Sequence, residues 1–271
     1  MIYQTRGSDK SDPYNLLMER VNIVVISEGI RRTQTDFVTA EVPLTLEVNQ
    51  KEMVTLLCSP INLKELALGF LYTSGFIRKT ADLKKIIIDQ QRWKADVEID
   101  PSLFPEKLLF KRLYTSGCGK GIIFYNPLTS IHRRLSSKST FPGKNIIELM
   151  KKFQKSSPEF KQTGGVHSAA LCDREKILVL ADDIGRHNAL DKVIGKALLS
   201  TIHFEDKMTL ITGRISSEIL FKIQHCGIPA IASSSAPTDQ AVKLAKKADI
   251  TLVGFVRGNR LNVYSGEKRI T

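Results

Sequence analysis

The sequence predicts an α/β protein whose C-terminal domain has three layers and a mixed, mostly parallel sheet, preceded by a smaller α+β domain. Between residues 167 and 255, short apolar runs alternate with stretches of helical periodicity, a pattern typical of repeated strand–helix units. Two short strands joined by a turn open this series and add an antiparallel pair to the parallel strands. Before it, residues 21–99 hold several short β-branched runs and one amphipathic helix.

Shifts in composition divide the chain into four parts. We expect a polar tail at 1–20, an α+β domain at 21–132, a flexible basic linker at 133–144 and the α/β domain at 145–271. The linker is rich in serine and closes with a Pro-Gly pair, which favours a turn. With 271 residues, the chain is long enough for two modest domains with real hydrophobic cores.

In the first domain, alternation and turn residues predict five strands, the second and third of which form a hairpin. These strands are 21–26, 44–48, 53–58, 85–88 and 95–99. One helix is predicted from Asn62, which is expected to cap it together with Glu65 in a reciprocal capping box, to a stop at Gly75. Asn145 and Glu148 repeat this capping pattern at the start of the second domain.

In the second domain, strands and helices alternate. The predicted strands are 167–172, 176–181, 208–212, 229–232 and 250–255, and the predicted helices lie around 190–198 and at 217–225 and 239–248. Right-handed crossovers place helices on both faces of such a sheet, and ligands bind beyond the carboxyl ends of its strands. Four polar loops, rich in glycine or serine, are expected to meet there: 182–188, 213–217, 233–238 and 255–260.

The charge balance points to anionic partners. Forty Lys and Arg against 28 Asp and Glu give a formal net charge of +12, which attracts nucleic acid, phosphorylated cofactors or acidic proteins. The basic residues are spread along the chain, and signatures of RNA-recognition modules and zinc fingers are missing, which argues against a nucleic-acid partner. No stretch is apolar enough for a spanning helix, and the polar start lacks the apolar core of a secretory signal. We therefore expect a cytoplasmic protein without membrane contacts.

The cysteines form no Cys-x-x-Cys pair, which excludes a local zinc ribbon, and in a reducing compartment we expect free thiols. They are Cys58, Cys118, Cys172 and Cys226. Three of them lie in apolar contexts typical of buried cysteine. Cys118 instead stands among glycines in residues 115–121 with basic residues nearby, and positive charge favours the nucleophilic thiolate. Cys118 is therefore the candidate catalytic residue.

Three further loop residues are candidates for a binding pocket. Asp183 and His187 lie at the start of a predicted helix. Either they build an anion or nucleotide site with the helix-terminal amides, or a side chain of this loop caps the helix while His187 simply packs. Arg214 lies in a turn that resembles a phosphate-binding turn, although the chain has no P-loop motif. Arg257 and Arg260 flank a glycine at a strand end, where planar guanidinium groups suit phosphate or a guanine edge.

Several segments, spread over nearly the whole chain beyond the tail, follow one another in an order that is typical of one protein family. They are 41–49, 66–71, 163–171, 182–195, 227–229, 235–238 and 254–258. The most specific begins Asp182-Asp183-Ile184-Gly185-Arg186-His187-Asn188. In this order the segments resemble the formate dehydrogenase accessory sulfurtransferase family, FdhD, and the chain is identified as a member of it.

The resemblance implies a sulfurtransferase that accepts sulfur from an IscS-type cysteine desulfurase as a persulfide on Cys118. The sulfur then passes to the molybdenum of a bis-guanine-dinucleotide molybdopterin cofactor, the bound cargo, which is destined for formate dehydrogenase. The residues implied to hold this cofactor are Phe255, Val256, Arg257, Gly258, Asn259 and Arg260. The resemblance also implies a homodimer and a cytidine-deaminase-like fold for the second domain. The deaminase zinc signature is absent, so neither deamination nor a zinc site is expected.

The glycine-rich loop departs from the family pattern. Well-known members carry Cys-Gly-x-Cys-Gly, whereas this chain reads Ser116-Gly117-Cys118-Gly119 and keeps one cysteine. A relay between two loop cysteines is therefore impossible, and Cys118 must act alone. Two alternatives stay open. One is a carrier that binds the cofactor and hands it over without sulfur chemistry, which the missing cysteine favours. The other is a nucleic-acid-binding module, which only the net charge supports.

Overall fold

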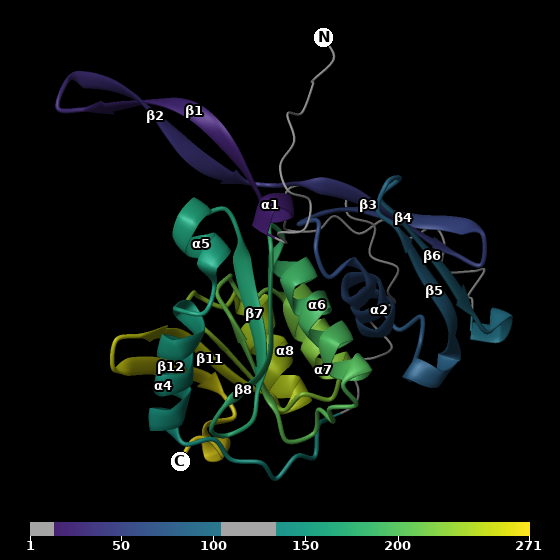
Figure 1. Ribbon diagram of the computed structural model, residues 1–271. Coiled ribbons are helices and arrows are strands. Elements are labelled where there is room, and N and C mark those ends of the chain that lie inside the picture. The colour runs from purple at the N-terminus through teal and green to yellow at the C-terminus, as the bar shows by residue number, and fades with distance from the viewer. Residues whose placement is uncertain (1–13, 104–133) are drawn as a thin grey trace.

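The computed structural model describes residues 14–103 and 134–271 (Figure 1). Its strands form a six-stranded sheet, a four-stranded sheet and a two-stranded arm. The six-stranded sheet and its helices make up the larger body, and the four-stranded sheet stands beside it, with α2 (Leu63–Thr73) and α6 (Arg186–Leu199) packed together between the two sheets (Figure 1). The predicted mixed α/β fold is therefore confirmed. Among the described residues, no helix is long and apolar enough to cross a membrane.

The four-stranded sheet and the arm come from the N-terminal part of the chain. The arm is formed by β1 (Met18–Ser27) and β2 (Ile30–Thr39) after the short helix α1 (Tyr14–Leu17), and the sheet by β3 (Val42–Val48), β4 (Lys51–Cys58), β5 (Leu83–Asp89) and β6 (Lys94–Ile99). Two 3-10 helices are η1 (Thr80–Asp82) and η2 (Pro101–Leu103). The strand order is β4-β3-β6-β5, and β3 and β4 form the predicted hairpin. Every second residue of β3 is buried, and these side chains share one core with α2.

The six-stranded sheet comes from the C-terminal part and has the order β12-β11-β10-β9-β7-β8. Its strands are β7 (His167–Cys172), β8 (Ile177–Asp183), β9 (Met208–Ile211), β10 (Ala230–Ser233), β11 (Thr251–Arg257) and β12 (Arg260–Ser265). The other helices here are α4 (Gly143–Gln154), α5 (Pro158–Thr163), α7 (Ser217–His225), α8 (Asp239–Ala248) and η4 (Glu267–Arg269). Helices α7 and α8 begin and end at the predicted residues.

The orientation of this sheet differs from the prediction. It is mixed, as expected, but of the five pairings among the described strands, only β9–β10 and β10–β11 are parallel. The prediction of a mostly parallel sheet is wrong for two reasons. Strand β7 runs opposite to both of its neighbours, and β12 closes the far edge through a hairpin that the sequence analysis did not anticipate.

Helices cover both faces of the six-stranded sheet. Along β7, Ala169 and Leu171 pack with α6, α7 and α8, while Ala170 and Cys172 pack with α4. This alternation follows from the two-residue period of a strand. The C-terminal part thus has the three predicted layers, with α2 and the four-stranded sheet added outside α6.

The two parts of the chain meet where α2 crosses α6. A Cβ added to Gly69 of α2 would overlap the backbone carbonyl of Asp191, and one added to Gly195 of α6 would overlap that of Glu65. Glycine at both positions therefore allows the two helix backbones to approach closely.

Helix α2 begins directly after Asn62, as predicted, but its predicted capping box is wrong, and so is the predicted start of α4 at Asn145. Asn62 has φ 54° and ψ 38°, a left-handed conformation, and its side chain makes no capping hydrogen bond. An N-cap side chain reaches the first turn from an extended backbone, which Asn62 lacks. Helix α4 begins at Gly143 behind Pro142, so that Asn145 is already helical and its side-chain amide donates to Arg174 O at 3.0 Å instead.

Of the predicted linker, 133–144, residues 143 and 144 already belong to α4, and residues 134–142 run along the C-terminal end of the chain. Leu135 N donates to Ala248 O, and Phe141, which is buried, pairs with Ile270. Arg269 Nε donates to Ser137 O at 3.2 Å. These contacts bind the segment to the larger body. The division of the chain into domains stays a prediction.

Candidate functional site

Three helices begin at one edge of the six-stranded sheet, which we call the carboxyl edge because β8, β9 and β10 end there. Helices α6, α7 and α8 follow these strands directly, so their first N–H groups and the positive ends of their dipoles face this edge. Ser216 and Thr238 cap α7 and α8 by accepting hydrogen bonds from the N–H groups of Ile219 and Ala241. The edge therefore favours anionic groups.

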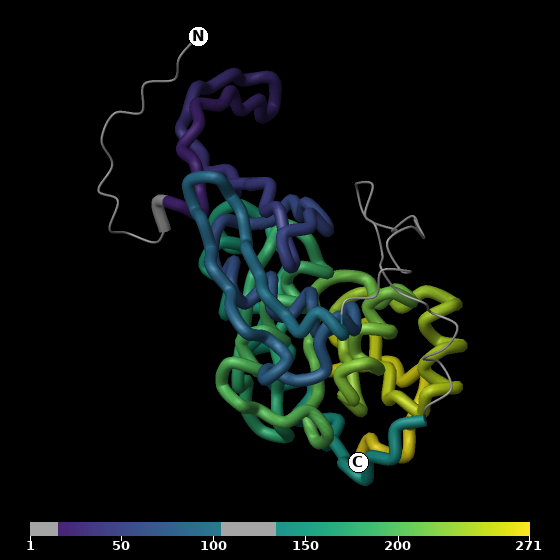
Figure 2. Tube along the Cα trace, turned by 90° about the vertical axis from the view of Figure 1, so that its right-hand side faces the viewer, coloured from purple at the N-terminus to yellow at the C-terminus, as the bar shows by residue number. Residues whose placement is uncertain are grey.

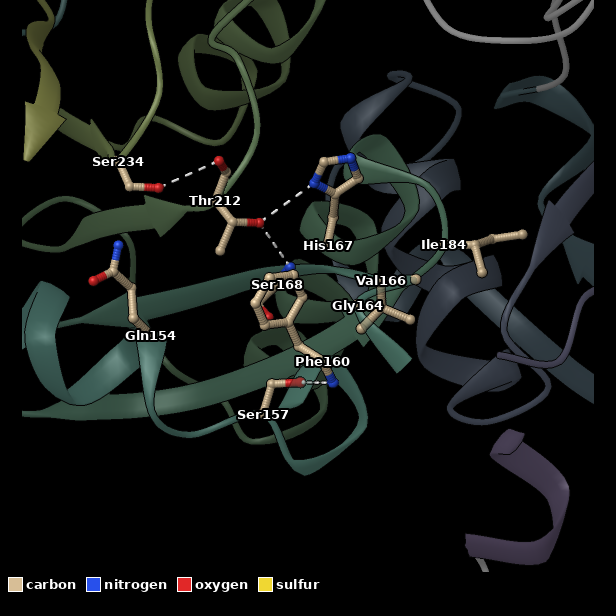
Figure 3. A pocket seen from close by; sticks show the side chains of 11 residues that line it. Gln154, Ser157, Phe160, Gly164, Val166, His167, Ser168, Ile184, Thr212 and Ser234 are labelled. Atoms are coloured by element: carbon tan, nitrogen blue, oxygen red, sulfur yellow. Dashed lines mark hydrogen bonds between the residues drawn. The ribbon is translucent and has the colours of Figure 1, made fainter. Parts of the chain in front are cut away.

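A cavity of about 360 Å³ opens at the carboxyl edge (Figure 3). Its lining combines the end of α4, helix α5, the start of β7 and the residues after β8, β9 and β10. These residues are Gln154, Ser157, Phe160, Gly164, Gly165, Val166, His167, Ser168, Ile184, Thr212 and Ser234. The volume lies at the lower end of the range for small-molecule sites. The cavity agrees with the predicted position of a site beyond the strand ends.

His167 and Thr212 form the polar centre of the cavity wall (Figure 3). Thr212 Oγ1 accepts from Ser168 N at 3.1 Å and lies 3.4 Å from His167 Nδ1. Burial, together with the nearby positive charge of Arg186, lowers the pKa of His167, so the ring is neutral at pH 7. A Cβ on Gly213 would come within 3.1 Å of Arg186 and 3.4 Å of His167, which shows how closely these groups gather. The sequence analysis did not single out His167 or Thr212.

The predicted cofactor segment, residues 255–260, forms the β11–β12 hairpin beside this cavity. Phe255 has φ 51° and lies at a β-bulge, and its N–H donates to Ser235 O at 3.0 Å. Arg257 Nε donates to the carbonyl of Ser234, a residue that lines the cavity, at 2.7 Å. The structure thus joins the hairpin to the 233–238 loop, as expected for loops that meet at one edge. The side chains from Arg257 to Arg260 are exposed.

Asp183 lies beneath the edge and has no exposed surface. Lys192 Nζ is 2.6 Å from its carboxylate, and both side chains are fully buried. The carboxylate also accepts from Ser59 N, Gly185 N and Asn188 Nδ2 at 2.8–3.1 Å. All of these contacts are internal, and Gly185 precedes the first residue of α6. They favour a structural role for Asp183, which binds the start of α6 to the segment after β4, over a role in an anion site. The predicted side-chain cap is not formed, because Gly185 is the N-cap residue of α6 and no side chain caps this helix.

A second buried ion pair lies deeper in the same interface, and the sequence analysis did not anticipate it. Lys222 Nζ of α7 is 2.6 Å from the Asp191 carboxylate of α6, and Thr73 Oγ1 of α2 donates to the same carboxylate at 2.7 Å. Burial raises the pKa of Asp191, while Lys222 opposes this shift. The pair connects three helices and lies away from the cavity lining.

His187 and Arg214 occupy different environments. Burial lowers the pKa of His187 to about 2, so its ring is neutral and its 3.4 Å contact with Glu218 is not an ion pair. Burial also raises the pKa of Glu218. Arg214, in the loop after β9, is exposed at the carboxyl edge. Of the two, only Arg214 is accessible to a large anion.

Comparison with known proteins places these features in a family. The model of the FdhD/NarQ family matches residues 39–271, which include the carboxyl edge, the β11–β12 hairpin and both buried ion pairs. The chain belongs to the FdhD/NarQ family. Its described part holds no group of three or more His, Cys, Asp or Glu side chains arranged as metal ligands.

Similar FdhD/NarQ proteins include curated bacterial relatives and a solved structure. The chain is 44% identical over 251 residues to "Sulfur carrier protein FdhD" of Bacillus pumilus, covering 90% of this chain and 94% of that protein. It is 41% identical over 237 residues to the protein of the same name from Bacillus subtilis, covering 87% and 90%. The crystal structure of a putative formate dehydrogenase accessory protein from Desulfotalea psychrophila superposes with a TM-score of 0.78 at 27% identity, covering 94% of this chain and 100% of that one.

Three of the four cysteines of this FdhD/NarQ chain lie in its hydrophobic cores. Cys58 and Cys172 have no exposed surface, and Cys226 is 6% exposed. Burial raises the pKa of Cys58 and of Cys172 to about 12 and raises that of Cys226 further. Cys118, the candidate catalytic residue, lies outside the described residues.

Proposed function

We propose that this protein is a sulfur carrier that serves formate dehydrogenase and holds the sulfur as a persulfide on Cys118. Relatives that are 41–44% identical over most of the chain carry the name sulfur carrier protein. The solved relative is titled a formate dehydrogenase accessory protein. Family membership over residues 39–271 supports the transfer of this role to the present chain.

The observation that supports Cys118 as the thiol is the burial of the other three cysteines. A persulfide carrier must expose a thiolate to the donor and then to the acceptor. Cys58, Cys172 and Cys226 are buried, and burial raises the pKa of each thiol, so all three stay protonated and out of reach at pH 7. Cys118 is the remaining cysteine, and its glycine-rich, basic sequence suits an accessible thiolate.

The first step of the proposed sulfur transfer is a thiol–persulfide exchange between the desulfurase and Cys118. The Cys118 thiolate attacks the terminal sulfur of the persulfide on a cysteine desulfurase, the sulfur–sulfur bond of the donor breaks, and the desulfurase cysteine leaves as a thiolate. Cys118 then carries the terminal sulfur without release of free sulfide. Delivery of this sulfur as sulfide consumes two electrons, for which a low-molecular-weight thiol is the proposed reductant. The proposed acceptor is the molybdenum of a bis-guanine-dinucleotide cofactor.

The carboxyl edge is the proposed binding place for that cofactor. It presents three helix N-termini, the exposed guanidinium groups of Arg214, Arg257 and Arg260, and a cavity with neutral His167. Diphosphate groups bind favourably to helix-terminal amides and to arginine.

Guanosine diphosphate is a suitable probe of this binding place. We expect Arg260→Ala to weaken its binding about tenfold in calorimetry, because a charged hydrogen bond contributes about 1.5–3 kcal/mol. The control Arg92→Ala, in the turn between β5 and β6, should leave the affinity unchanged.

Complementation of formate dehydrogenase activity tests the proposal in cells. In a bacterium that lacks its own sulfur carrier of this family, the wild-type chain and Cys226→Ala should restore activity, whereas Cys118→Ala should not. Immunoblots keep the comparison to equal amounts of folded protein. Activity with Cys118→Ala equal to that of the wild type would contradict sulfur transfer. It would favour the carrier that binds the cofactor without sulfur chemistry.

A further inference from the structure

Helix α5 places two of its side chains contrary to their polarity. It buries the carboxylate of Glu159, which is 2% exposed, and leaves the ring of Phe160 46% exposed. Glutamate is almost never fully buried without a partner, whereas phenylalanine is among the residues most often found inside. The exposed ring lines the cavity of the carboxyl edge and points into it (Figure 3). The fold thus presents an aromatic face to the space where a ligand would lie.

Contacts on the other side of α5 fix this orientation. The Thr39 hydroxyl donates to Glu159 Oε1, and Thr39 lies at the base of the arm of β1 and β2, which projects from the rest of the described chain (Figures 1 and 2). Ser157 Oγ caps the helix by accepting from Phe160 N at 3.0 Å, and Gly164 ends it with φ of 64°. The helix is therefore held at both ends and from behind, and the Phe160 ring needs no rearrangement to meet a ligand.

The cavity beside Phe160 has an uncharged lining. Among the described residues that line it there is no Asp, Glu, Lys or Arg, and its one histidine, His167, is neutral at pH 7. Phe160, Val166 and Ile184 supply apolar surface, while hydroxyl, amide and imidazole groups supply hydrogen-bond donors and acceptors. A phosphate group would find no cationic side chain in this lining. A flat, neutral ring with polar edges can use both kinds of surface.

We propose that the cavity binds a neutral 2-amino-4-oxopyrimidine ring, the ring that guanine and pterin share, with its face stacked on Phe160. The choice of this ring rests on the proposed function, because the proposed cargo contains both guanine and pterin. The cavity volume of about 360 Å³ suits one such ring system rather than the whole cofactor.

The neighbouring hairpin supports this placement of the ring. Arg257 Nε donates to the carbonyl of Ser234, a residue that lines the cavity, at 2.7 Å, so the guanidinium group stands at its rim. In the cofactor the diphosphate links the guanosine to the pterin. When one ring lies against Phe160, the diphosphate can therefore lie against arginine outside the cavity.

Calorimetry with defined probes tests the ring site in the full-length chain. Guanosine diphosphate and 6-hydroxymethylpterin present the two rings, and inorganic pyrophosphate presents the phosphates without a ring. Phe160→Ala should weaken binding of the probe whose ring enters the cavity by about tenfold or more, the usual effect of removing an aromatic stacking partner from a base. Phe160→Tyr keeps the aromatic face and should retain the affinity of the wild type. Pyrophosphate should bind Phe160→Ala and the wild type equally.

The matched control is Leu199→Ala, at the last residue of α6. Leu199 is 45% exposed, as Phe160 is, but it does not line the cavity, so its loss should leave the affinity for every probe unchanged. Circular dichroism verifies the fold of each variant. A loss confined to guanosine diphosphate identifies the bound ring as guanine, a loss confined to the pterin identifies it as pterin, and a loss with both shows that the cavity accepts either.

Three outcomes would overturn the proposal. They are the same affinity of Phe160→Ala and the wild type for both ring probes, an equal loss of pyrophosphate binding in Phe160→Ala, and a wild type that binds neither ring. Failure of the proposed function gives a different result. Sulfur transfer fails if Cys118 gains no sulfur, which is measured without any ring probe. The diphosphate site fails if Arg260→Ala binds guanosine diphosphate and pyrophosphate as the wild type does.

Discussion

Replacement of Lys192 by methionine tests how the two parts of the chain are joined. Lys192 Nζ contacts the Asp183 carboxylate at 2.6 Å and the carbonyl of Ser59 at 3.1 Å, and the ion pair has no exposed surface. Ser59 follows β4 of the N-terminal sheet, whereas Asp183 and Lys192 belong to the C-terminal body. Methionine has a similar shape without the charge, so Lys192→Met leaves Asp183 buried and unpaired.

The expected loss follows from the contacts that remain. Removal of one partner from a buried ion pair costs about 3–5 kcal/mol of the free energy of unfolding. The Asp183 carboxylate still accepts from three donors, Ser59 N, Gly185 N and Asn188 Nδ2. We therefore expect a loss in the lower half of that range. The double variant Asp183→Asn/Lys192→Met should recover part of it, because no unpaired charge is left inside.

Urea unfolding, followed by circular dichroism, measures these differences. The matched control is Lys243→Met, which removes an ammonium group from an ion pair with Asp239 whose side chains are 68% and 71% exposed. Exposed pairs of this kind contribute little, so the control should unfold like the wild type. If Lys192→Met and Lys243→Met unfold at the same urea concentration, the buried pair does not stabilise the fold as argued.

Three other predictions concern packing, titration and thiol reactivity. Gly195→Ala should lower the free energy of unfolding by about 3 kcal/mol or more, since its Cβ would overlap the carbonyl of Glu65. A Cβ on Gly143 would meet its nearest neighbour at 3.6 Å, so Gly143→Ala should leave the free energy of unfolding unchanged. Thermal unfolding of both variants measures the difference. The pKa of His187 is about 2 in the folded chain. Below pH 6.5, His187 therefore binds a proton in the unfolded chain but not in the folded chain, and protonation favours unfolding. From pH 6.5 to 5 this removes about 2 kcal/mol of stability, and His187→Gln should flatten the measured pH dependence by that amount. Finally, a thiol reagent should react rapidly with one cysteine of the native chain, Cys118, and with four in denaturant; rapid reaction of two or more native thiols would contradict the burial of the others.

Much of the fold follows from local pattern. The hairpin of β3 and β4 and the helices α7 and α8 were predicted correctly because alternation, turn residues and helical periodicity agree there. Strand β2 escaped prediction because its residues from Arg31 to Asp36 are polar, with no buried face to impose alternation. The capping pattern at Asn62 failed because tertiary context fixes that residue in a left-handed conformation, which the sequence spacing does not reveal.

The candidate site shows the same limit. The convergence of loops at the carboxyl edge was predictable from the order of strands and helices, and the contact of Arg257 with Ser234 agrees with it. The roles of the buried lysines could not be predicted from the sequence. Lys192 and Lys222 lie in amphipathic helices, where lysine is normally solvated, and their partners are fixed by the packing of α2, α6 and α7. His167 reads as an ordinary strand residue until β7 is placed beside β9.

The most direct measurement of the central proposal is the mass of each cysteine-containing peptide after incubation with a cysteine desulfurase and cysteine. Alkylation traps persulfides before digestion, and a reaction without cysteine is the control. We predict one added sulfur on the peptide that contains Cys118, lost on treatment with a reducing thiol, and none on the peptides of Cys58, Cys172 and Cys226. Absence of the added sulfur from Cys118, or its presence on one of the buried cysteines instead, would contradict the proposed sulfur carrier mechanism.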